Sequence, residues 1–385
     1  MNIKNLSGWF DIYKEPSLSG RYIHLEHILP LFDTLSIHVE IELLGTSENN
    51  APIHLLKLGT GKKKLLFWSQ MHGNESTTTK AVFDFLNMLI DDTNEISQGI
   101  LASCTLYIIP ILSPDGAKAY TRLNYNQIDL NRDAQNKTQK ESILLRDIID
   151  RFQPNYAFNL HGQRTIFSAG ETKYPATVSF LSPAGDKERT ITPCRKIAME
   201  IIAEMNTVLQ QVIPNSVGRY DDGFNINCIG DTLSDMGIPT ILFEAGHYKD
   251  DYDREKTRVF IFYALVAAVD YISEKNIVGN LYENYFEIPE NGKCFYDIII
   301  RDVMLDKKNV DIAIQYTEEL SENDIKFIPK IVKIADLGNF YGHREIIGNK
   351  RVIQNENVTV EVVPDNEMLK FYLNDELFST ELRKS

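Results

Sequence analysis

Two side chains that can bind a metal ion stand close together in the first quarter of the chain, in the stretch His72-Gly73-Asn74-Glu75. This stretch follows an apolar run at residues 65–68 and precedes a helical pattern that extends to about residue 90. A histidine and a glutamate three residues apart at a helix start project from the same side of the helix. They supply two of the three protein ligands of a hydrolytic zinc site, whose fourth position is left to water. Because this pair is common by chance, the interpretation depends on the rest of the chain.

A third candidate ligand, His161, ends the apolar run 156–160 and is followed by Gly162. Proteins of the α/β class place their sites at the carboxyl ends of central strands, where this histidine is expected. An isolated histidine there is usually a hydrogen-bonded structural residue. With His72 and Glu75 in the same chain, we interpret His161 as the third ligand. His247 is a weaker candidate, because three ligands complete the set.

Glu244 ends another apolar run, residues 238–243, and is followed by the small residues Ala245 and Gly246. A carboxylate at the end of a buried strand is unfavourable unless a metal ion or polar partners compensate for its burial. Beside zinc, such a group can accept a proton from water and pass it to a leaving amine. The alternative is a salt-bridged structural glutamate.

The loop Asp129-Leu130-Asn131-Arg132 offers a possible anchor for a substrate. Arg132 has a planar donor fork that suits a carboxylate, and Asn131 adds neutral donors beside it. If the segment is extended, Asp129 points away from its neighbour and could accept the free N–H of a zinc-bound imidazole. Arg122, ten residues before Arg132, could stabilise a developing oxyanion. A polar loop and a surface arginine remain the ordinary alternatives.

The composition limits the class of protein. The chain has 385 residues, a formal net charge of −14 and 43% hydrophobic residues, so we expect a buried globular core and neither nucleic acid nor an anionic membrane as the main partner. Its four cysteines are widely spaced, which favours reduced thiols. With no apolar leader and no run of about 18 apolar residues, we expect a cytoplasmic protein without a membrane span.

Short apolar runs alternate with helical patterns over most of the chain. We expect strands at residues 37–46, 53–59, 64–69, 105–111, 156–160, 178–181 and 240–243, and helices at residues 75–90, 139–152, 186–212 and 254–272. This alternation predicts an α/β fold with a mixed sheet sandwiched between helices.

After about residue 275 the pattern changes. Short apolar runs at residues 296–300, 310–314, 360–363 and 369–373 are separated by turns rich in Asn, Asp and Gly. We therefore expect a catalytic domain over residues 1–280 and a small all-β domain over residues 281–385.

Taken together, these motifs resemble the carboxypeptidase A-like zinc metallocarboxypeptidase family over roughly residues 35–275. The resemblance rests on five pieces in the family's order: His72-x-x-Glu75, Ser113-Pro114-Asp115-Gly116, Asp129-Leu130-Asn131-Arg132, His161 and Glu244. It implies a mixed eight-stranded sheet between helices and one zinc ion per chain. It also implies these roles: His72, Glu75 and His161 as zinc ligands, Glu244 as general base and acid, Asn131 and Arg132 as holders of the substrate's terminal carboxylate, Arg122 as oxyanion stabiliser, and Asp129 as the residue that orients His72.

Two features depart from the family pattern. Ser113 begins the Pro-Asp-Gly turn where asparagine is usual. The family's mobile-loop tyrosine has only a weak candidate in Tyr220, since the loop at residues 218–231 has no motif. The preferred substrate side chain is not indicated.

Three functions remain open at this stage. The first is a hydrolase of the metallopeptidase class that acts in proteolysis by cleaving the C-terminal bond of a peptide. The second is a zinc amidohydrolase of small N-acyl amino acids or cell-wall peptides, because deacylases resembling aspartoacylase and succinylglutamate desuccinylase share the His-Gly-Asn-Glu and Asp-Leu-Asn-Arg motifs. The Pro-Asp-Gly turn and the expected β domain favour the peptidase. The third is a non-catalytic binding module. Oligomeric state stays open.

Overall fold

A computed structural model describes residues 3–357 and 359–382 of the chain. These residues form two compact units, each described here by itself. The first unit comprises the chain up to Gln163 and from Ala176 to Asn291. The second comprises Arg164–Pro175 and the chain from Gly292 onward, so it includes a short segment from the middle of the sequence.

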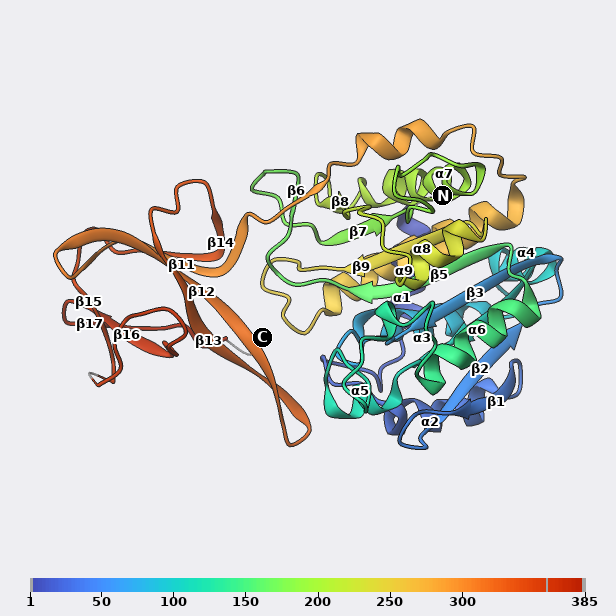
Figure 1. The fold of residues 1–385 in the computed structure, drawn as a ribbon, viewed down its shortest axis with the longest axis horizontal. Helices are drawn as coiled ribbons and strands as arrows, with labels where there is room; N and C mark the ends of the chain where they lie inside the picture. The colour runs from blue at the N-terminus through green and yellow to red at the C-terminus, as the bar shows by residue number, and fades with distance from the viewer. Residues whose placement is uncertain (1–2, 358, 383–385) are drawn as a thin grey trace. The chain divides into compact units, whose positions relative to one another are not determined.

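An eight-stranded mixed sheet forms the centre of the first unit (Figure 1), in the order β1-β2-β4-β3-β5-β9-β7-β8. Its strands are β1 (Glu40–Thr46), β2 (Pro52–Leu58), β3 (Lys63–Ser69), β4 (Cys104–Ile109), β5 (Tyr156–Gly162), β7 (Val178–Leu181), β8 (Val217–Arg219) and β9 (Thr240–Ala245). The central strands β4, β3, β5 and β9 run parallel to one another, and β2 and β7 are antiparallel to the outer members of this group. Buried on both faces, the central strands are almost continuously apolar.

Helices cover both faces of this sheet, which confirms the predicted α/β sandwich. The larger apolar core lies on the face covered by α1 (Ile3–Tyr13), α2 (Leu25–Leu35), α3 (Thr77–Leu89), α4 (Glu95–Ser103), α7 (Pro193–Leu209) and α9 (Glu255–Glu274). A smaller core lies under α6 (Lys140–Phe152) and α8 (Ile229–Asp235). Short elements α5 (Pro114–Ala119), η1 (Leu130–Arg132) and η2 (Tyr282–Glu287) complete the unit.

Some predicted boundaries were wrong. The helix expected from Glu75 begins only at Thr77, so the His72–Glu75 motif occupies the turn before α3. The helix expected at residues 186–212 begins at Pro193, because proline suits the first turn and the Thr192 hydroxyl caps it. Residues 360–363, expected to be extended, lie outside the strands.

The second unit is built from β-strands, as expected for the C-terminal part of the chain. Its strands are β6 (Ser168–Ala169), β11 (Phe295–Leu305), β12 (Lys308–Ser321), β13 (Asp324–Ala335), β14 (Tyr341–Ile347), β15 (Ile353–Asn355), β16 (Lys370–Leu373) and β17 (Glu376–Ser379), with β10 (Asn291–Gly292) at the passage between units. Strands β6 and β10 form a two-stranded sheet. The others form a four-stranded sheet, β13-β12-β11-β14, and a three-stranded sheet, β15-β16-β17, that share an apolar core.

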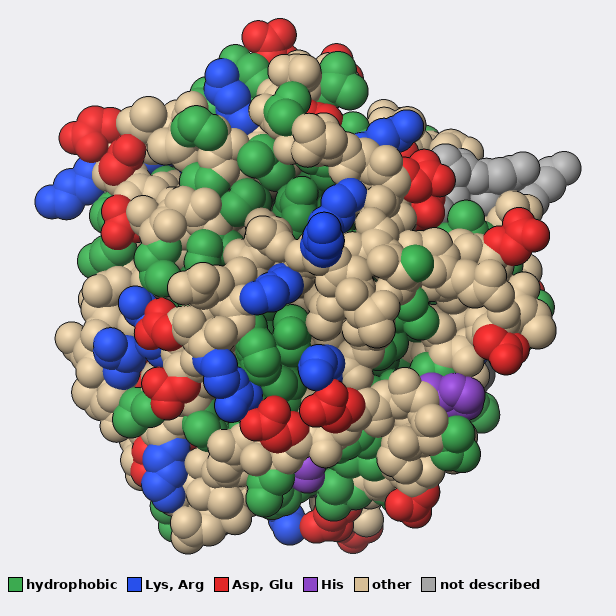
Figure 2. Space-filling model, turned by 90° about the vertical axis from the view of Figure 1, so that its right-hand side faces the viewer, with side chains coloured by type: hydrophobic (Ala, Val, Ile, Leu, Met, Phe, Trp, Pro, Cys, Tyr) green, Lys and Arg blue, Asp and Glu red, His purple; other side chains and the backbone are tan. Residues whose placement is uncertain are grey.

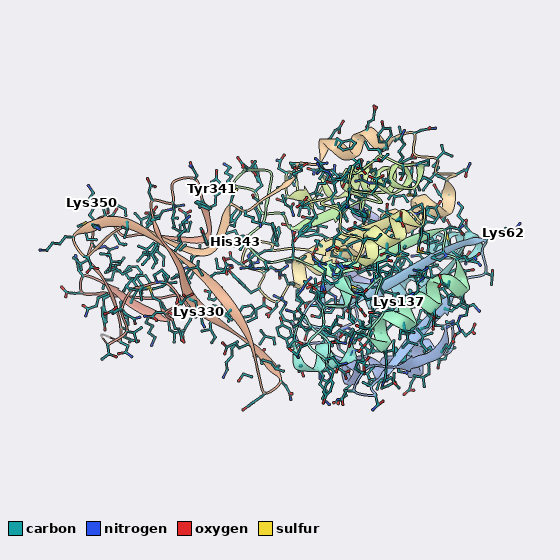
Figure 3. All side chains as sticks on the ribbon, in the orientation of Figure 1. Lys62, Lys137, Lys330, Tyr341, His343 and Lys350 are labelled. Atoms are coloured by element: carbon teal, nitrogen blue, oxygen red, sulfur yellow. The ribbon has the colours of Figure 1, made fainter. Side chains whose placement is uncertain are left out.

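The segment Arg164–Pro175 is held inside this second unit. The hydroxyl of Thr165 accepts a hydrogen bond from Gln315 Nε2 at 2.5 Å, and its carbonyl accepts one from His343 Nε2 at 2.8 Å. His343 lies on β14 (Figure 3). Because β5 ends at Gly162, the strand that carries His161 leads directly into this segment.

The surface carries both signs of charge. On the face shown in Figure 2, acidic and basic side chains are intermixed and apolar side chains reach the surface between them. Within the described part of the chain, no helix has the length and apolar character needed to cross a membrane.

Candidate metal centre and active site

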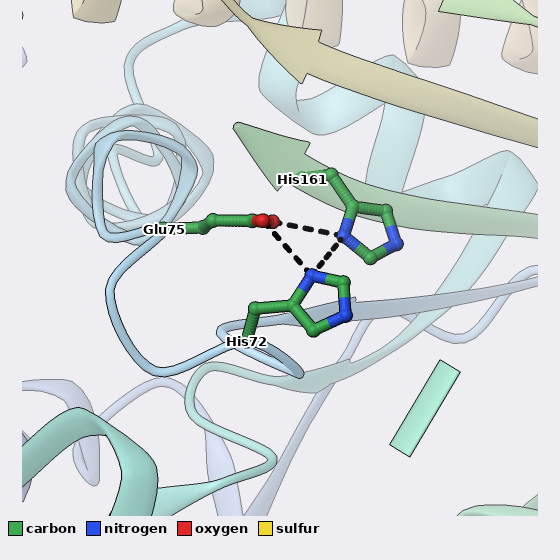
Figure 4. Close-up of side chains that lie close together, drawn as sticks. All are labelled: His72, Glu75 and His161. Carbon is green, nitrogen blue, oxygen red and sulfur yellow. Dashed lines mark hydrogen bonds and ion pairs between the residues drawn. The ribbon is translucent and has the colours of Figure 1, made fainter. Parts of the chain in front are cut away.

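Three side chains meet at the carboxyl edge of the central strands, from His72, Glu75 and His161 (Figure 4). His72 Nδ1 lies 2.9 Å from Glu75 Oε1, His161 Nδ1 lies 2.9 Å from Glu75 Oε2, and the two Nδ1 atoms are 3.2 Å apart. Among the described residues, this is the one group of three or more His, Cys, Asp or Glu side chains whose ligand atoms come together in this way. The structure therefore unites the three predicted ligands.

The turn that carries His72 and Glu75 is fixed by contacts from distant parts of the chain. The buried Gln70 donates through Nε2 to the carbonyls of Ile23, at 2.9 Å, and Gly73, at 2.8 Å. Gly73 packs directly on the backbone of Gly116, so that a side chain at position 73 would overlap it. The Ser113–Gly116 motif thus has a structural role, since its backbone at Gly116 packs against the turn that carries His72 and Glu75.

Parallel strands bring the other ligand into place. In the register of β5 with β9, His161 pairs with Glu244. The N–H of Gly162 donates to Glu75 Oε2 at 3.0 Å and so fixes the carboxylate against the end of β5. On the far side of the other imidazole, His72 Nε2 lies 3.0 Å from Asp129 Oδ1. This contact orients the His72 ring, as outer carboxylates commonly do for metal-bound histidines.

The electrostatics keep Glu75 ionised. Burial alone would raise its pKa, but the charge of His72 and the hydrogen bonds from His161 and His72 outweigh burial and hold the pKa of Glu75 well below its usual range. The carboxylate is therefore a charged, acceptor-only group, as a metal ligand must be.

This donor set fits zinc. Bonds of about 2.0–2.1 Å in a tetrahedral site separate neighbouring ligand atoms by roughly 3.3 Å, close to the separations observed here. Zinc would displace the proton that charges His72, and two neutral imidazoles with a carboxylate are a set that zinc accepts and that leaves one position open. His72 has its outer partner in Asp129, whereas the buried Nε2 of His161 has no hydrogen-bond partner among the described residues.

Glu244 stands one strand away from His161, and only 9% of its surface is exposed. Its Oε2 atom is buried and has no hydrogen-bond partner within the described parts of the chain. Burial, followed by the negative charge of Glu75, raises the pKa of Glu244 well above its usual value, while Arg122 and Arg254 oppose the rise. A carboxyl group with raised pKa and a free oxygen is suited to take up and release a proton.

Arg122 stands beside the metal-binding cluster. Its Nη1 atom lies 3.3 Å from Glu75 Oε1 and its Nη2 atom 3.0 Å from Asp129 Oδ2, with nearly half of the side chain exposed. A cation in this position can act on an oxygen that develops negative charge near the cluster.

Asn131 and Arg132 belong to the turn that carries Asp129. Asn131 Oδ1 accepts the N–H of Ile229 at 3.1 Å, which leaves its amide hydrogens as donors. Arg132 Nη1 contacts its neighbour's carbonyl, Asn131 O, at 2.8 Å and Cys228 Sγ at 3.1 Å. Both side chains are therefore anchored near the start of α8, with Arg132 exposed to solvent.

Tyr220 lies at the site as well. Burial raises the pKa of Tyr220 to about 12, and the charges of Glu244, Arg122 and Glu75 also act on it. Its phenol is thus protonated and can donate. His247 is outside the metal-binding group, and its ring packs against Tyr252 with the two planes tilted by 55°.

Two buried residues near the site were missed from the sequence. Asn159 lies two residues before His161 on β5, hence on the same face, and is fully buried. Neither polar atom of its carboxamide has a hydrogen-bond partner in the described structure. Arg254 contacts the backbone at the ends of β5 and β9. A polar residue inside the apolar run 156–160 was the available signal for Asn159; the sequence held none for Arg254.

The fold is that of metallocarboxypeptidases. Similar solved structures include a candidate carboxypeptidase A of Shewanella denitrificans (TM-score 0.55, 18% identity, 64% of this chain and 68% of that chain covered). A second is a metallo-carboxypeptidase of Burkholderia cenocepacia (TM-score 0.51, 17% identity, 64% of this chain and 69% of that chain covered). A third is the carboxypeptidase A of Helicoverpa armigera (TM-score 0.52, 16% identity, 70% of this chain and 80% of that chain covered). Among curated proteins, none matches this sequence.

Residues 31–232 match the family described as zinc carboxypeptidase, peptidase M14. Because this match covers more than half of the chain, the protein belongs to the zinc carboxypeptidase family. The predicted family is thereby confirmed, and the His72, Glu75 and His161 set is a candidate metal site consistent with the zinc site typical of that family.

Proposed function

We propose that this protein is a zinc-dependent carboxypeptidase that removes the C-terminal residue of a peptide. The observation that carries the proposal is the placement of Glu244 beside the three-ligand cluster, in register with His161 and with an unpartnered carboxylate oxygen among the described residues. Membership of the family supports it.

Each residue has a defined task in this reaction. A bound zinc ion would supply Lewis-acid polarisation of the scissile carbonyl and acidification of water. Glu244 accepts a proton from the attacking water at a carboxylate oxygen and then transfers it to the leaving amine. Arg122 donates to the carbonyl oxygen as negative charge develops on it. Asn131 and Arg132 bind the terminal carboxylate of the peptide, and thereby place its last peptide bond at the cluster.

The test combines metal content with turnover. His161→Ala should lose zinc, because one of three ligands is gone. Glu244→Gln should retain about one zinc per chain and lose about 10²–10⁴-fold in kcat, because the amide cannot accept the proton. His247→Ala is the matched control: it removes another buried histidine, and zinc should remain bound. Full activity in Glu244→Gln would sink the mechanism.

Substrate choice separates carboxypeptidase from deacylase. The proposal expects a peptide with a free C-terminal carboxylate to be cleaved far faster than the same peptide with a C-terminal amide. Small N-acyl amino acids cleaved faster than any peptide would assign the site to amide hydrolysis instead. If the protein binds zinc but cleaves neither peptides nor N-acyl amino acids, the site would be that of a non-catalytic binding module.

A further inference from the structure

Arg254 holds together the ends of the two strands that carry His161 and Glu244. It immediately precedes α9, and only 2% of its surface is exposed. Its Nη1 atom donates to the carbonyls of Ala245, at 2.7 Å, and Gly246. Its Nη2 atom donates to the carbonyl of Gln163 at 3.0 Å. One guanidinium group thus spans the ends of β5 and β9, which lie side by side (Figure 1).

The bridged carbonyls are close to the reacting groups in the chain. Ala245 follows Glu244 directly, and Gln163 is two residues beyond His161. The regular pairing of the strands ends with Gly162 opposite Ala245, and the Gln163 N–H still reaches the Ala245 carbonyl at 3.0 Å. Beyond that bond, Gly246 donates its N–H to Thr177, on the other side of β9. Arg254 therefore adds a cross-link where the ladder between the two strands stops.

The backbone of Arg254 indicates that the side chain is needed there. The residue has φ 60° and ψ 25°, in the left-handed region that favours glycine or asparagine. An arginine accepts this conformation at an energetic cost, and a strained position kept by its surroundings is a reason to look for a function. A guanidinium group donates through several N–H groups held in one rigid plane, so it fixes the carbonyls of both strands in a single geometry, whereas a lysine ammonium is a point charge on a flexible stem with three rotatable donors.

We propose that Arg254 is a positioning residue, which sets the spacing between the metal ligand His161 and the general base Glu244 through the backbone of their strands. The inference rests on the proposed function for its effect on turnover, but its effect on zinc binding does not depend on any substrate. It assigns Arg254 no contact with substrate.

Arg258, one helical turn later on α9, provides a matched control. It is also an arginine, is fully buried and donates to backbone carbonyls, those of Leu18 and Glu15, besides its ion pair with Asp84. None of these partners belongs to β5 or β9. Loss of Arg258 removes a buried charge network of the same helix without touching the two strand ends.

The experiment compares full-length Arg254→Lys, Arg254→Met and Arg258→Met with the unchanged protein. Zinc affinity is measured by competition with a chelator. The visible spectrum of the cobalt-substituted protein reports the geometry of the ligands. The constants kcat and KM are measured on a peptide with a free C-terminus. We expect Arg254→Lys to bind zinc at least about tenfold more weakly, to change the cobalt spectrum and to lower kcat more than it raises KM. Arg258→Met should lower the unfolding midpoint and keep the zinc affinity, spectrum and kcat of the folded protein.

Two results would overturn the inference. One is unchanged zinc affinity, cobalt spectrum and kcat in Arg254→Lys; the other is the same loss of all three in Arg258→Met. If Arg254→Met does not fold, the lysine variant carries the test. If the unchanged protein binds zinc but cleaves no peptide, the proposed function fails, while the zinc affinities and spectra still decide the role of Arg254.

Discussion

Gly73→Ala should greatly weaken zinc binding without altering any ligand. A Cβ atom at position 73 would lie 1.9 Å from the carbonyl carbon of Gly116 and 2.1 Å from the nitrogen of Ala117, whereas real Cβ atoms stay beyond 3.0 Å. The two backbone segments must therefore separate by about 1 Å. The segment around Gly116 is held by its own bonds, since Ala117 N donates to Ser113 O at 2.9 Å. We therefore expect the turn with His72 and Glu75 to be displaced, against the hydrogen bonds from Gln70 that fix it.

A shift of about 1 Å is several times larger than the tolerance of about 0.2 Å on a metal–ligand distance. We expect zinc affinity to fall at least about 100-fold and stability to fall by about 3 kcal/mol. The assays are zinc titration against a chelator and urea unfolding. Gly99→Ala is the control: no atom lies within 4 Å of its added methyl group on α4, so it should gain about 0.5–1 kcal/mol and keep its zinc. Normal zinc affinity in Gly73→Ala would refute the reasoning.

Three further predictions concern stability. Asp84→Asn leaves the fully buried Arg258 without its main counter-charge, so urea unfolding should show a loss of stability of about 3 kcal/mol. The double variant Asp84→Leu with Arg258→Met should lose less stability than the sum of the losses in the single variants Asp84→Leu and Arg258→Met. Burial raises the pKa of Asp231 to about 6, above the unfolded value of about 3.9, so the folded state binds more protons and stability falls as the pH rises from about 4 through 6. Asp231→Asn should remove this decline and be about 1–2 kcal/mol more stable at pH 7, as measured by thermal unfolding across that range. Asn159→Leu removes two polar atoms that have no hydrogen-bond partner among the described residues, and should gain about 1–2 kcal/mol in the zinc-loaded protein; a loss would show that the carboxamide binds a partner such as water.

The sequence predicted the cluster of His72, Glu75 and His161 because metal-binding side chains stand at recognisable places, next to or at the end of apolar runs. His161 and Glu244 each end an apolar run, and parallel strands place such ends at one edge of the sheet. Their register then brings the two residues opposite each other. The three-residue spacing of His72 and Glu75 likewise predicted that their side chains lie together, although a turn and not a helix carries them.

What the sequence did not predict depends on contacts between distant segments. The close approach of Gly73 and Gly116 joins residues far apart in the chain, and nothing local to either glycine indicates it. Arg254 has the same difficulty, since an arginine in a charged loop is ordinarily a surface residue. The helix α2 was missed because Pro30 lies inside it, which argues against a helix when only the sequence is considered.

The segment Arg164–Pro175 ties the chain after His161 to residues that are synthesised much later. Its Thr165 binds Gln315 and His343, which come 150 and 178 residues later. At about 5–20 residues per second, a ribosome needs roughly 10–30 seconds to add those partners. During that interval the nascent chain already contains His72, Glu75 and His161, while Thr165 still lacks its partners Gln315 and His343. This stretch can therefore take its final conformation only after residues 315 and 343 have been synthesised, and a ribosome that stalls near residue 291 would leave His72, Glu75 and His161 in a chain whose Thr165 lacks both partners.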